Sequence, residues 1–385
     1  MLMLGWRLAA ASVPTPSPPS PPACSLNGAL SSGDGKTCVC DSAWRGAACD
    51  VLDVRPADPA RAGYRNATGF NSWGGNALFD SRSGRWHLFS AQFVDRKTLD
   101  AWGTASEIVR AVSDTPFGPF VYAETVVPVW AHNPTVRKFQ GKFYLYMIGA
   151  GHNADDGGKP SNLNFTSAIH VSVADDITGP WSVPEPVLFE DASPSLWVGR
   201  YNPSPHFLDD GSVLLAFNGG PRNSSWPKSV AKEYPGIALS APGPRNYRGP
   251  FKLIHHGLPV FPKKLGCFGG TGEDPFIWHD KRGLKMLIHG MCPTGLMQAH
   301  FASSPDLGAT WYLSPRETYT YNVGWVNGSS TFFSRVERPQ LSFDPATGHP
   351  IALWNGVCED FGCLGILGGR AGRSYTLARP LARAT

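Results

Sequence analysis

The chain contains a repeated sequence unit, and this repeat restricts the fold more than any other feature. Five segments share a polar opening, a short apolar run, a turn and a second apolar run rich in aromatic or branched residues. They are SWGGNALFDSRSGRWHLFSAQF from Ser72, HNPTVRKFQGKFYLYMIGAG from His132, YNPSPHFLDDGSVLLAFNGG from Tyr201, GEDPFIWHDKRGLKMLIHGM from Gly272 and ERPQLSFDPATGHPIALWNGV from Glu337. Counted from Trp73, Asn133, Asn202, Asp274 and Arg338, the spacings are 60, 69, 72 and 64 residues. Recurrence at such an interval indicates a repeat architecture.

A second repeated element follows each hairpin and completes a unit of four strands. It has a strand with alternating apolar residues, a turn and a Gly-Pro-aromatic start to another strand, as in SDTPFGPF, ADDITGPW and YRGPF. Five such units predict an all-β fold, a five-bladed β-propeller over residues 51–385, with a β-sandwich as the alternative. The 43 glycines and 35 prolines also disfavour a helical bundle. Because the fifth unit is incomplete, we expect residues 51–55 to close the ring.

The polar openings of the five hairpins are expected to meet in space. In a propeller the first strand of each blade lines the central channel, so residues far apart in the sequence gather at one mouth. The gathered residues would be Trp73, His132 with Asn133, Tyr201 with Asn202, Glu273 with Asp274, and Glu337 with Arg338. Acids, amides, a histidine and aromatic rings in one concave place predict a small-ligand site.

The first part of the chain differs in composition from the repeats. Residues 1–23 begin with MLMLGWRLAAAS, which has the apolar run and small residues of a secretory signal but no basic n-region. The following VPTPSPPSPPA favours extended polyproline II and cannot form a packed core. We interpret residues 1–23 as a weak signal or anchor segment with a proline-rich spacer.

Residues 24–50 contain Cys24, Cys38, Cys40 and Cys49, four of the eight cysteines. A segment this short needs staples to fold, and disulfides are favoured over a zinc site because no histidine lies nearby. A Cys before Asn-Gly, then C-x-C and W-x-G-x-x-C, resembles an EGF-like module. The resemblance implies the pairs Cys24–Cys38 and Cys40–Cys49.

The other cysteines and the glycosylation motifs point to the same compartment. We expect a disulfide between Cys358 and Cys363, which enclose a short loop, and another between Cys267 and Cys292, which flank the fourth hairpin. Four N-x-[ST] sequons begin at Asn66, Asn164, Asn223 and Asn327. Together these features predict an extracellular or secretory-pathway location.

Charge and hydropathy limit the partners. A net charge of +4 without a Lys/Arg cluster argues against nucleic acid. No apolar run reaches the roughly 18 to 20 residues that a membrane span needs, so we expect no transmembrane helix. We expect a monomer that binds carbohydrate.

The hairpin grammar and the Gly-Pro-aromatic element resemble the five-bladed propellers of glycoside hydrolase family 43. That family inverts the anomeric centre with an Asp base on the first blade, an Asp on the third that tunes the acid, and a Glu acid on the fourth. The resemblance implies that Glu273, in GEDP, is the general acid. Asn202 stands where the third-blade Asp is expected, and SWGGNA on the first blade offers no carboxylate.

Three hypotheses follow for the funnel. The first is a glycoside hydrolase acting on plant or algal glycans, with Glu273 as acid and His132 or Glu337 as base. The second is a catalytically inactive glycan-binding propeller, and the third is a structural or interaction module. The candidate substrate-binding residues are Trp73, Trp102, Asn133, Asn202, Asp274, Glu337 and Arg338. Strand alternation predicts that Asp274 points away from Glu273 unless a bulge intervenes.

No dedicated cofactor or metal site is predicted from the motifs. The family resemblance leaves room for a Ca²⁺ ion in the propeller axis. His289, inside an apolar strand, is interpreted as a hydrogen-bonded inner histidine rather than a metal ligand.

Overall fold

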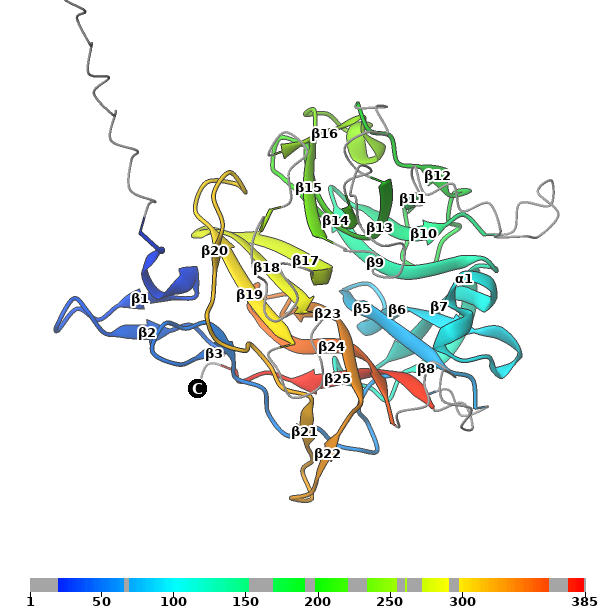
Figure 1. Cartoon of the computed structure of the whole chain (residues 1–385). Coiled ribbons are helices and arrows are strands. Elements are labelled where there is room, and N and C mark those ends of the chain that lie inside the picture. Colours follow the sequence, from blue (N-terminus) through cyan, green and yellow to red (C-terminus); the bar gives the residue numbers. More distant parts are fainter. Residues whose placement is uncertain are drawn as a thin grey trace, which may run out of the picture.

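The computed structural model describes residues 20–65, 69–151, 169–190, 198–220, 234–254, 260–261, 272–290, 298–359 and 373–383. Within them, five antiparallel sheets are arranged around a common centre (Figure 1). Four of the sheets have four strands and the fifth has three. The predicted five-bladed β-propeller is confirmed.

Each blade uses its strands in chain order from the centre outward. Blade one contains β5 (Ser72–Asp80), β6 (Arg85–Phe93), β7 (Ser106–Ser113) and β8 (Val121–Val127). Blade two contains β9 (Ala131–Phe139), β10 (Lys142–Gly149), β11 (Ile169–Ala174) and β12 (Glu185–Pro186). Blade three contains β13 (Val198–Phe207), β14 (Val213–Gly220), β15 (Tyr234–Ser240) and β16 (Phe251–Leu253).

The remaining blades follow the same plan. Blade four contains β17 (Gly272–Asp280), β18 (Gly283–Gly290), β19 (Ala299–Ser304) and β20 (Tyr312–Leu313). Blade five contains β23 (Arg335–Phe343), β24 (Pro350–Cys358) and β25 (Ser374–Pro380). A hairpin of β21 (Asn322–Gly324) and β22 (Ser330–Phe332) projects between blades four and five, and the short helix α1 (Trp102–Ala105) precedes β7 (Figure 1). Single 3-10 turns lie at Ala23–Leu26, Val94–Arg96, Leu99–Ala101 and Asn246–Arg248.

The second strand of each blade is buried on both faces, because neighbouring blades pack against it from either side. All eight residues of β18 and all nine of β24 are buried. Aromatic side chains fill the spaces between blades, as where the Phe120 and Trp354 rings meet edge to face at 5.4 Å. These contacts explain the near-continuous apolar runs that the sequence shows at the second strand of each hairpin.

The ring closes through the segment preceding the first blade. Val54 bridges Leu381 in antiparallel fashion, the Arg55 amide donates to the Pro380 carbonyl at 2.8 Å, and the Ala382 amide donates to the Asp53 carbonyl at 2.9 Å. Residues 53–55 therefore act as the missing fourth strand of blade five. Closure was predicted over residues 51–55, but Val51 and Leu52 pair with Arg45 and Trp44 instead.

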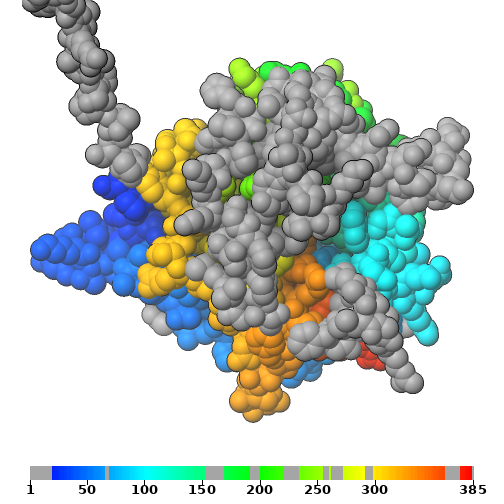
Figure 2. Space-filling model, in the orientation of Figure 1, coloured from blue at the N-terminus to red at the C-terminus, as the bar shows by residue number. Residues whose placement is uncertain are grey.

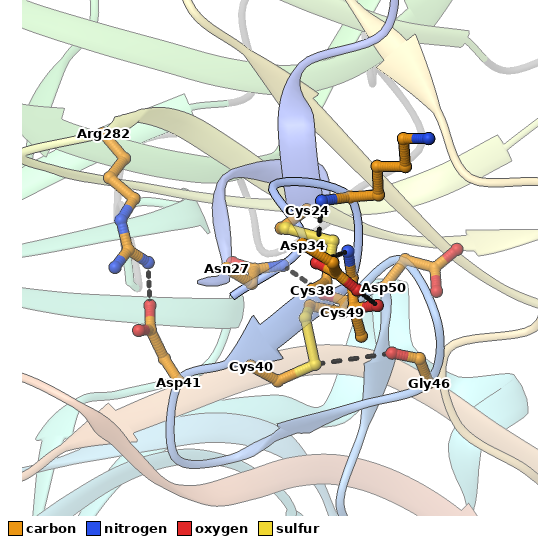
Figure 3. Close-up of a disulfide and its surroundings, with 12 residues drawn as sticks. Cys24, Asn27, Asp34, Cys38, Cys40, Asp41, Gly46, Cys49, Asp50 and Arg282 are labelled. Carbon is orange, nitrogen blue, oxygen red and sulfur yellow. Dashed lines mark hydrogen bonds and ion pairs between the residues drawn. A yellow bond between two sulfur atoms is a disulfide. The ribbon is translucent and has the colours of Figure 1, made fainter. Parts of the chain in front are cut away.

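The N-terminal module is built from two small hairpins and two disulfides. Its strands are β1 (Gly28–Leu30), β2 (Cys38–Cys40), β3 (Trp44–Arg45) and β4 (Val51–Leu52). Disulfides join Cys24 to Cys38 and Cys40 to Cys49, with Cα atoms 5.5 and 5.3 Å apart (Figure 3). The four thiols are thus used in the EGF-like pairing, and the zinc alternative is wrong.

The module is docked against blade four. Trp44 is 7% exposed and packs its ring on Phe301 at 4.8 Å. Asp41 pairs with Arg282 in the β17–β18 turn (Figure 3), and the buried Asp50 pairs with Arg316 at 2.5 Å. In the space-filling view the module lies beside the gold surface of blade four (Figure 2). Apolar packing and ion pairs together hold the module on the propeller.

Several sequence predictions lie outside the described residues. These are residues 1–19 of the signal segment, the thiols Cys267, Cys292 and Cys363, and the sequons at Asn66, Asn164 and Asn223. Cys358 is disulfide-bonded, and its predicted partner, Cys363, is one of these thiols. In the described part of the chain, no helix has the length and hydropathy that a membrane crossing would require.

Candidate functional site

Every inner strand carries a β-bulge at the same repeat position. On each blade, two inner-strand residues stand opposite one residue of the second strand. The bulged pairs are Gly74–Gly75, Asn133–Pro134, Asn202–Pro203, Asp274–Pro275 and Arg338–Pro339. The first residue of each pair is left-handed, with φ of 61°, 53°, 54°, 58° and 57° respectively. The repeat therefore extends to backbone conformation.

The residue types at the bulge suit this conformation. Glycine, asparagine and aspartate adopt positive φ more readily than other residues, and they occupy four of the five positions. Proline in the next position has no amide hydrogen to pair, which is tolerated at a bulge. On blade one, a Cβ on Gly75 would lie 2.0 Å from the Phe89 carbonyl oxygen, so only glycine fits there. Arg338 is the exception among these residue types.

The bulge overturns the expectation that Asp274 points away from the funnel. An extra residue shifts the alternation of the strand, so that consecutive side chains can face the same side. Both Glu273 and Asp274 line the funnel cavity. The alternation argument failed because it assumed a regular strand across Asp274.

Five residues at the bulge form what we call the bulge ring: Gly74, Asn133, Asn202, Asp274 and Arg338. The Asn133 amide donates to Asn202 Oδ1 at 2.5 Å, and the Asn202 amide donates to Asp274 Oδ1 at 2.7 Å. Arg338 donates to Asp274 through its backbone amide at 3.1 Å and through Nη1 at 2.9 Å. The four side chains are 4–6% exposed. Their hydrogen bonds connect blades two to five around the axis.

The ring closes by packing at blade one. A Cβ on Gly74 would lie 2.9 Å from the Arg338 Cβ, so the arginine stem occupies the space that glycine leaves. Because the Arg338 guanidinium supplies a positive charge here, the bulge ring does not offer the all-oxygen shell that Ca²⁺ takes. The residues present do not fit the axial Ca²⁺ that the family resemblance allowed.

The residues one position earlier form a second set, the opening ring: Trp73, His132, Tyr201, Glu273 and Glu337. Together with the four side chains of the bulge ring, they line a cavity of about 200 Å³, to which Leu99, Trp102, Ile148 and Arg335 also contribute. All nine residues proposed from the sequence as catalytic or substrate-binding lie on this cavity. We call it the funnel.

The two tryptophans of the funnel differ in accessibility. Trp73 is 2% exposed, and its indole lies 2.5 Å from where a Cβ on Gly356 would stand, so it packs into blade five. Trp102 is partly exposed, with its ring 5.7 Å from that of His132. Trp102 thus has some accessible ring surface for a sugar, whereas Trp73 has almost none.

His132 is buried beside the funnel and held by a hydroxyl. Its Nδ1 lies 2.7 Å from Ser106 Oγ, and the side chain lies among the rings of Phe93 and Trp102. Burial, together with the Arg338 charge, lowers the pKa of His132 well below its usual range. The imidazole is therefore neutral at physiological pH and a poor general base.

Three carboxylates surround His289 at the boundary of blades four and five. Its Nδ1 is 3.7 Å from Glu273 Oε1 and 3.9 Å from Asp274 Oδ2, and its Nε2 is 4.0 Å from Glu337 Oε1. One ligating atom from each of the four residues lies within 4.8 Å of the others. Arg335 pairs with Glu337 at 2.5 Å. Glu273 and Glu337 have side chains 18% and 11% exposed, so they are the accessible acids of the group.

Some residues of the site were not among those proposed from the sequence. Tyr201 was expected at the mouth of the channel, because it holds the same repeat position as Glu273, but it was not proposed as a substrate-binding residue. Arg335 lies two residues before Glu337, on the same face of β23, and could have been found from strand periodicity. Tyr321 comes from outside the repeat, in the segment before β21, and no sequence signal indicates its contact with His289.

The comparisons with known proteins agree with this architecture. A family model described as a teneurin-like EGF domain matches residues 20–52. No curated protein sequence matches the chain significantly. Solved structures with a similar fold include Zg3597, a family 117 glycoside hydrolase from the marine bacterium Zobellia galactanivorans, with a TM-score of 0.55 and 15% identity over 86% of this chain and 90% of that one.

Two further structures have comparable similarity. An endo-arabinase from Bacteroides thetaiotaomicron has a TM-score of 0.50 and 13% identity, covering 83% of this chain and 97% of that one. A family 43 β-1,3-galactosidase has a TM-score of 0.52 and 12% identity, covering 86% of this chain and 63% of that one. At these identities the likeness shows the fold: the propeller is of the type found in glycoside hydrolase families 43 and 117, of which the sequence resemblance indicated family 43.

Proposed function

We propose that the protein is a glycoside hydrolase whose funnel binds one terminal sugar unit, with Glu273 as the proton donor. The observation that carries the proposal is the position of Glu273: its partly exposed carboxylate lies on the cavity with Trp102, Tyr201 and Glu337. Aromatic faces, amides and paired acids are the groups that sugar recognition and glycosidic cleavage require. The similar structures named above include enzymes that their names describe as glycoside hydrolases of families 43 and 117.

The size of the funnel supports a small ligand. A cavity of about 200 Å³ is below the roughly 300 to 1,000 Å³ of pockets for drug-sized ligands. A single sugar ring at the end of a chain fits this space better than the middle of a polysaccharide does. We therefore propose release of terminal residues from plant or algal glycans.

The spacing of the acids favours Glu337 as the partner of Glu273. Inverting pairs stand about 6.5 to 9.5 Å apart to admit a water, and retaining pairs about 5 to 5.5 Å. Oxygens of Glu273 and Glu337 lie within 4.8 Å, which suits the retaining arrangement. In that reaction Glu337 bonds to the anomeric carbon as the glycosidic C–O bond breaks and Glu273 protonates the leaving oxygen. Water then cleaves the glycosyl ester, with Glu273 taking its proton.

A glycan-binding propeller without catalysis is the second candidate. It is favoured by Asn202, which stands where the family has a carboxylate and whose amide is already bound to Asp274 at 2.7 Å. Blade one also favours binding without catalysis, because the buried Trp73 stands at its opening position and that opening offers no carboxylate for a general base. Release of sugar from a bound glycan distinguishes the hydrolase from the binding propeller.

We further propose that the protein folds in the secretory pathway. Two disulfides in the N-terminal module and the disulfide-bonded Cys358 support an oxidising compartment. Asn327 lies exposed at the tip of the β21–β22 hairpin, where a glycosyltransferase could reach it. Expression in secretory cells followed by glycosidase treatment would test this; an unmodified Asn327 would contradict glycosylation there.

The experiment for the main proposal is a screen of plant and algal glycans that follows both released sugar and binding. We expect turnover by the wild type, and a loss of at least about 10²-fold in kcat for Glu273→Gln and Glu337→Gln with binding retained. Glu124→Gln is the matched control, because Glu124 is also paired with an arginine, Arg110, but lies on the outer strand of blade one. Proton NMR of the first-formed anomer reports the stereochemistry, and we expect retention.

The alternatives give different results in the same screen. Binding without turnover, equal in the wild type and both variants, would reject the hydrolase and support the binding propeller. Turnover with inversion would keep the hydrolase but reject Glu337 as nucleophile.

A further inference from the structure

A separate cavity of about 310 Å³ lies at the end of the propeller channel opposite the funnel. The first residues of the inner strands line the funnel, whereas residues near the last positions of the same strands line this cavity. Examples are Leu78, Arg137, His206, His279 and Leu341. We call it the distal cavity. It shares no lining residue with the funnel, so a ligand there would not touch the proposed catalytic acids.

The N-terminal module forms one wall of the distal cavity. Asn27, Asp41 and Trp44 of the module all line it. Trp44 stacks on Trp278 of blade four, with ring centroids 6.3 Å apart and 16° between the ring planes. The propeller alone would leave this wall open. The docked module therefore completes a cavity that the repeats only begin.

The acids that line the distal cavity are already balanced by cations outside it. Asp41 pairs with Arg282 (Figure 3). Asp280 pairs with Lys285 at 2.5 Å. Neither Arg282 nor Lys285 is a lining residue of the cavity. The two carboxylates thus do not compensate the cations that do line it.

Arg137 presents an unbalanced charge to the distal cavity. Its Nε donates to the Pro205 carbonyl at 2.9 Å. Its Nη1 and Nη2 donate to the carbonyls of Val136 and Ile277, each at 3.3 Å. A guanidinium has five N–H groups, so one on each terminal nitrogen has no acceptor among the described residues. Burial lowers the pKa of Arg137 to about 9, which still leaves it charged at neutral pH. Buried charges are normally paired, and two parallel N–H groups suit a carboxylate or a sulfate.

A second cation and two neutral histidines lie beside this guanidinium. Lys138 is exposed, with its Nζ 5.2 Å from the Phe143 ring and no carboxylate partner in the described part of the chain. The rings of His206 and His279 are 5.9 Å apart. Burial, together with the charges of Arg137 and His279, lowers the pKa of His206 to about 3, so its imidazole is neutral. The histidines therefore offer hydrogen bonds, and Lys138 adds positive charge.

We propose that the distal cavity binds an acidic sugar, a ring that carries a carboxylate or a sulfate ester, with Arg137 and Lys138 holding the anion. The partly buried rings of Phe139 and Phe207, stacked at 4.9 Å, offer an apolar surface to the face of the sugar. The volume is at the lower end of the roughly 300 to 1,000 Å³ typical of ligand pockets. The preference for an anion follows from the charges, and the choice of a sugar rests on the proposed carbohydrate role.

The test is isothermal titration calorimetry of the full chain at low ionic strength with galacturonate, glucuronate and glucose sulfate. Glucose and benzoate serve as the neutral and the non-sugar comparison compounds. We expect one acidic sugar per distal cavity, with glucose at least about 10-fold weaker and with added salt weakening the acidic sugar. The relative affinities of the uronates and glucose sulfate identify the preferred anionic group.

Substitutions on both walls of the cavity assign the binding. Arg137→Gln should weaken it at least about 10-fold and Lys138→Gln about 3-fold. Asp41→Asn removes a negative charge from the module wall and should tighten binding about 2- to 3-fold, which a damaged fold would not do. Lys252→Gln is the matched control, because Lys252 is exposed on β16, the outer strand of blade three, and should bind like the wild type.

Thermal unfolding establishes that each variant is folded, and Lys138→Gln and Asp41→Asn carry the test if Arg137→Gln does not fold. No binding of any acidic sugar by the wild type would overturn the proposal, as would equal binding by the wild type and Lys138→Gln. Binding of benzoate but of no sugar would reject the sugar class. Binding that changes with Glu273→Gln instead of Lys138→Gln would assign the anion to the funnel and also overturn it.

The distal cavity and the proposed hydrolysis fail separately. Turnover of glycans by a chain that binds no acidic sugar would keep the hydrolase and reject the distal cavity as a site. Binding of an acidic sugar that depends on Lys138, by a chain that releases no sugar from any glycan, would support the distal cavity and reject the hydrolase.

Discussion

Glu273 stands directly opposite His289 across the first two strands of blade four, with its Oε1 3.7 Å from the histidine Nδ1. This cross-strand pair belongs to a bulged hairpin, so Asp274 turns to the same side and lies 3.9 Å from the same nitrogen. The hairpin thus gathers two acids and a base that a regular strand would have separated.

Removing the arginine charge from the bulge ring should destabilise the propeller. Arg338→Met keeps the packing stem over Gly74 but leaves the buried Asp274 carboxylate without its ion pair. Losing one partner of a buried pair costs about 3 to 5 kcal/mol. Urea unfolding should show this loss, whereas Arg335→Met, whose side chain is 33% exposed, should change the free energy of unfolding by less than about 1 kcal/mol. Equal effects of the two substitutions would contradict a structural role for the ring.

Restoring the carboxylate of family 43 on blade three should be unfavourable here. Asn202→Asp replaces an amide that donates to Asp274 at 2.7 Å with a second carboxylate, and we expect a loss of about 1 to 3 kcal/mol at pH 7. Repulsion raises the folded pKa of the acid pair above the unfolded value near 3.9, so the variant recovers stability as pH falls and loses it as pH rises. Unfolding measured from pH 4 to 7 checks this. A pH-independent deficit would disprove it, and the exposed Asn327→Asp is the control.

Acid should weaken the fold through buried histidines. Burial lowers the pKa of His132 well below its usual range and, with the charge of His289, lowers that of His300 to about 4. Below pH 6.5 the unfolded chain binds more protons than the folded one, so stability falls as pH decreases, by about 1.4 kcal/mol per pH unit for each histidine. For His300 the loss continues to about pH 4.

Urea midpoints between pH 7 and pH 5 measure this dependence. His300→Asn should make it shallower, because one of the buried titrating groups is gone. The exposed His349→Asn is the matched control. An unchanged slope for His300→Asn would show that the side chain does not resist protonation in the folded state.

The N-terminal module should contribute to the stability of the propeller. Trp44 is 7% exposed and contacts Trp278 and Phe301 of blade four, so Trp44→Ala should cost about 3 to 5 kcal/mol. Phe332→Ala, at an exposed hairpin position, should stay within about 0.5 kcal/mol. Thermal unfolding monitored by tryptophan fluorescence compares the two. A separate early transition for the module would contradict its integration into the blade.

Much of the architecture could be predicted from the sequence because propeller blades repeat. The five hairpins align with similar spacing. This alignment alone predicts five sheets and predicts that Glu273, His132 and Asn202 lie at one cavity. Ring closure by residues 53–55 followed from the incomplete fifth unit in the same way. The five sheets and the ring closure both follow from the repeat period, which can be read directly from the sequence.

The errors concern features that alternation does not encode. Asp274 was expected to turn away, although Gly74, Asn133 and Asn202 at the equivalent positions are residue types that favour positive φ, and this shared preference was the available signal for the bulge. Trp73 was proposed as a substrate-binding residue, but it is buried by packing on Gly356, and this packing depends on how blades one and five meet. Tyr321 could not be found, because its contact with His289 joins a segment outside the repeat to an inner hairpin.

The closure of the ring has a consequence for the order in which the protein can be made. Residues 53–55 leave the ribosome before any blade, yet their partners at 380–382 follow the strands of all five blades in the chain. Blades one to four are therefore synthesised before the ring can close. Residues 53–55 stay unpaired until residues 380–382 have been synthesised. Such distant pairing slows folding. Residues 53–55 directly follow the disulfide-linked N-terminal module. Early folding of this module would fix the position of residues 53–55 until the ring closes.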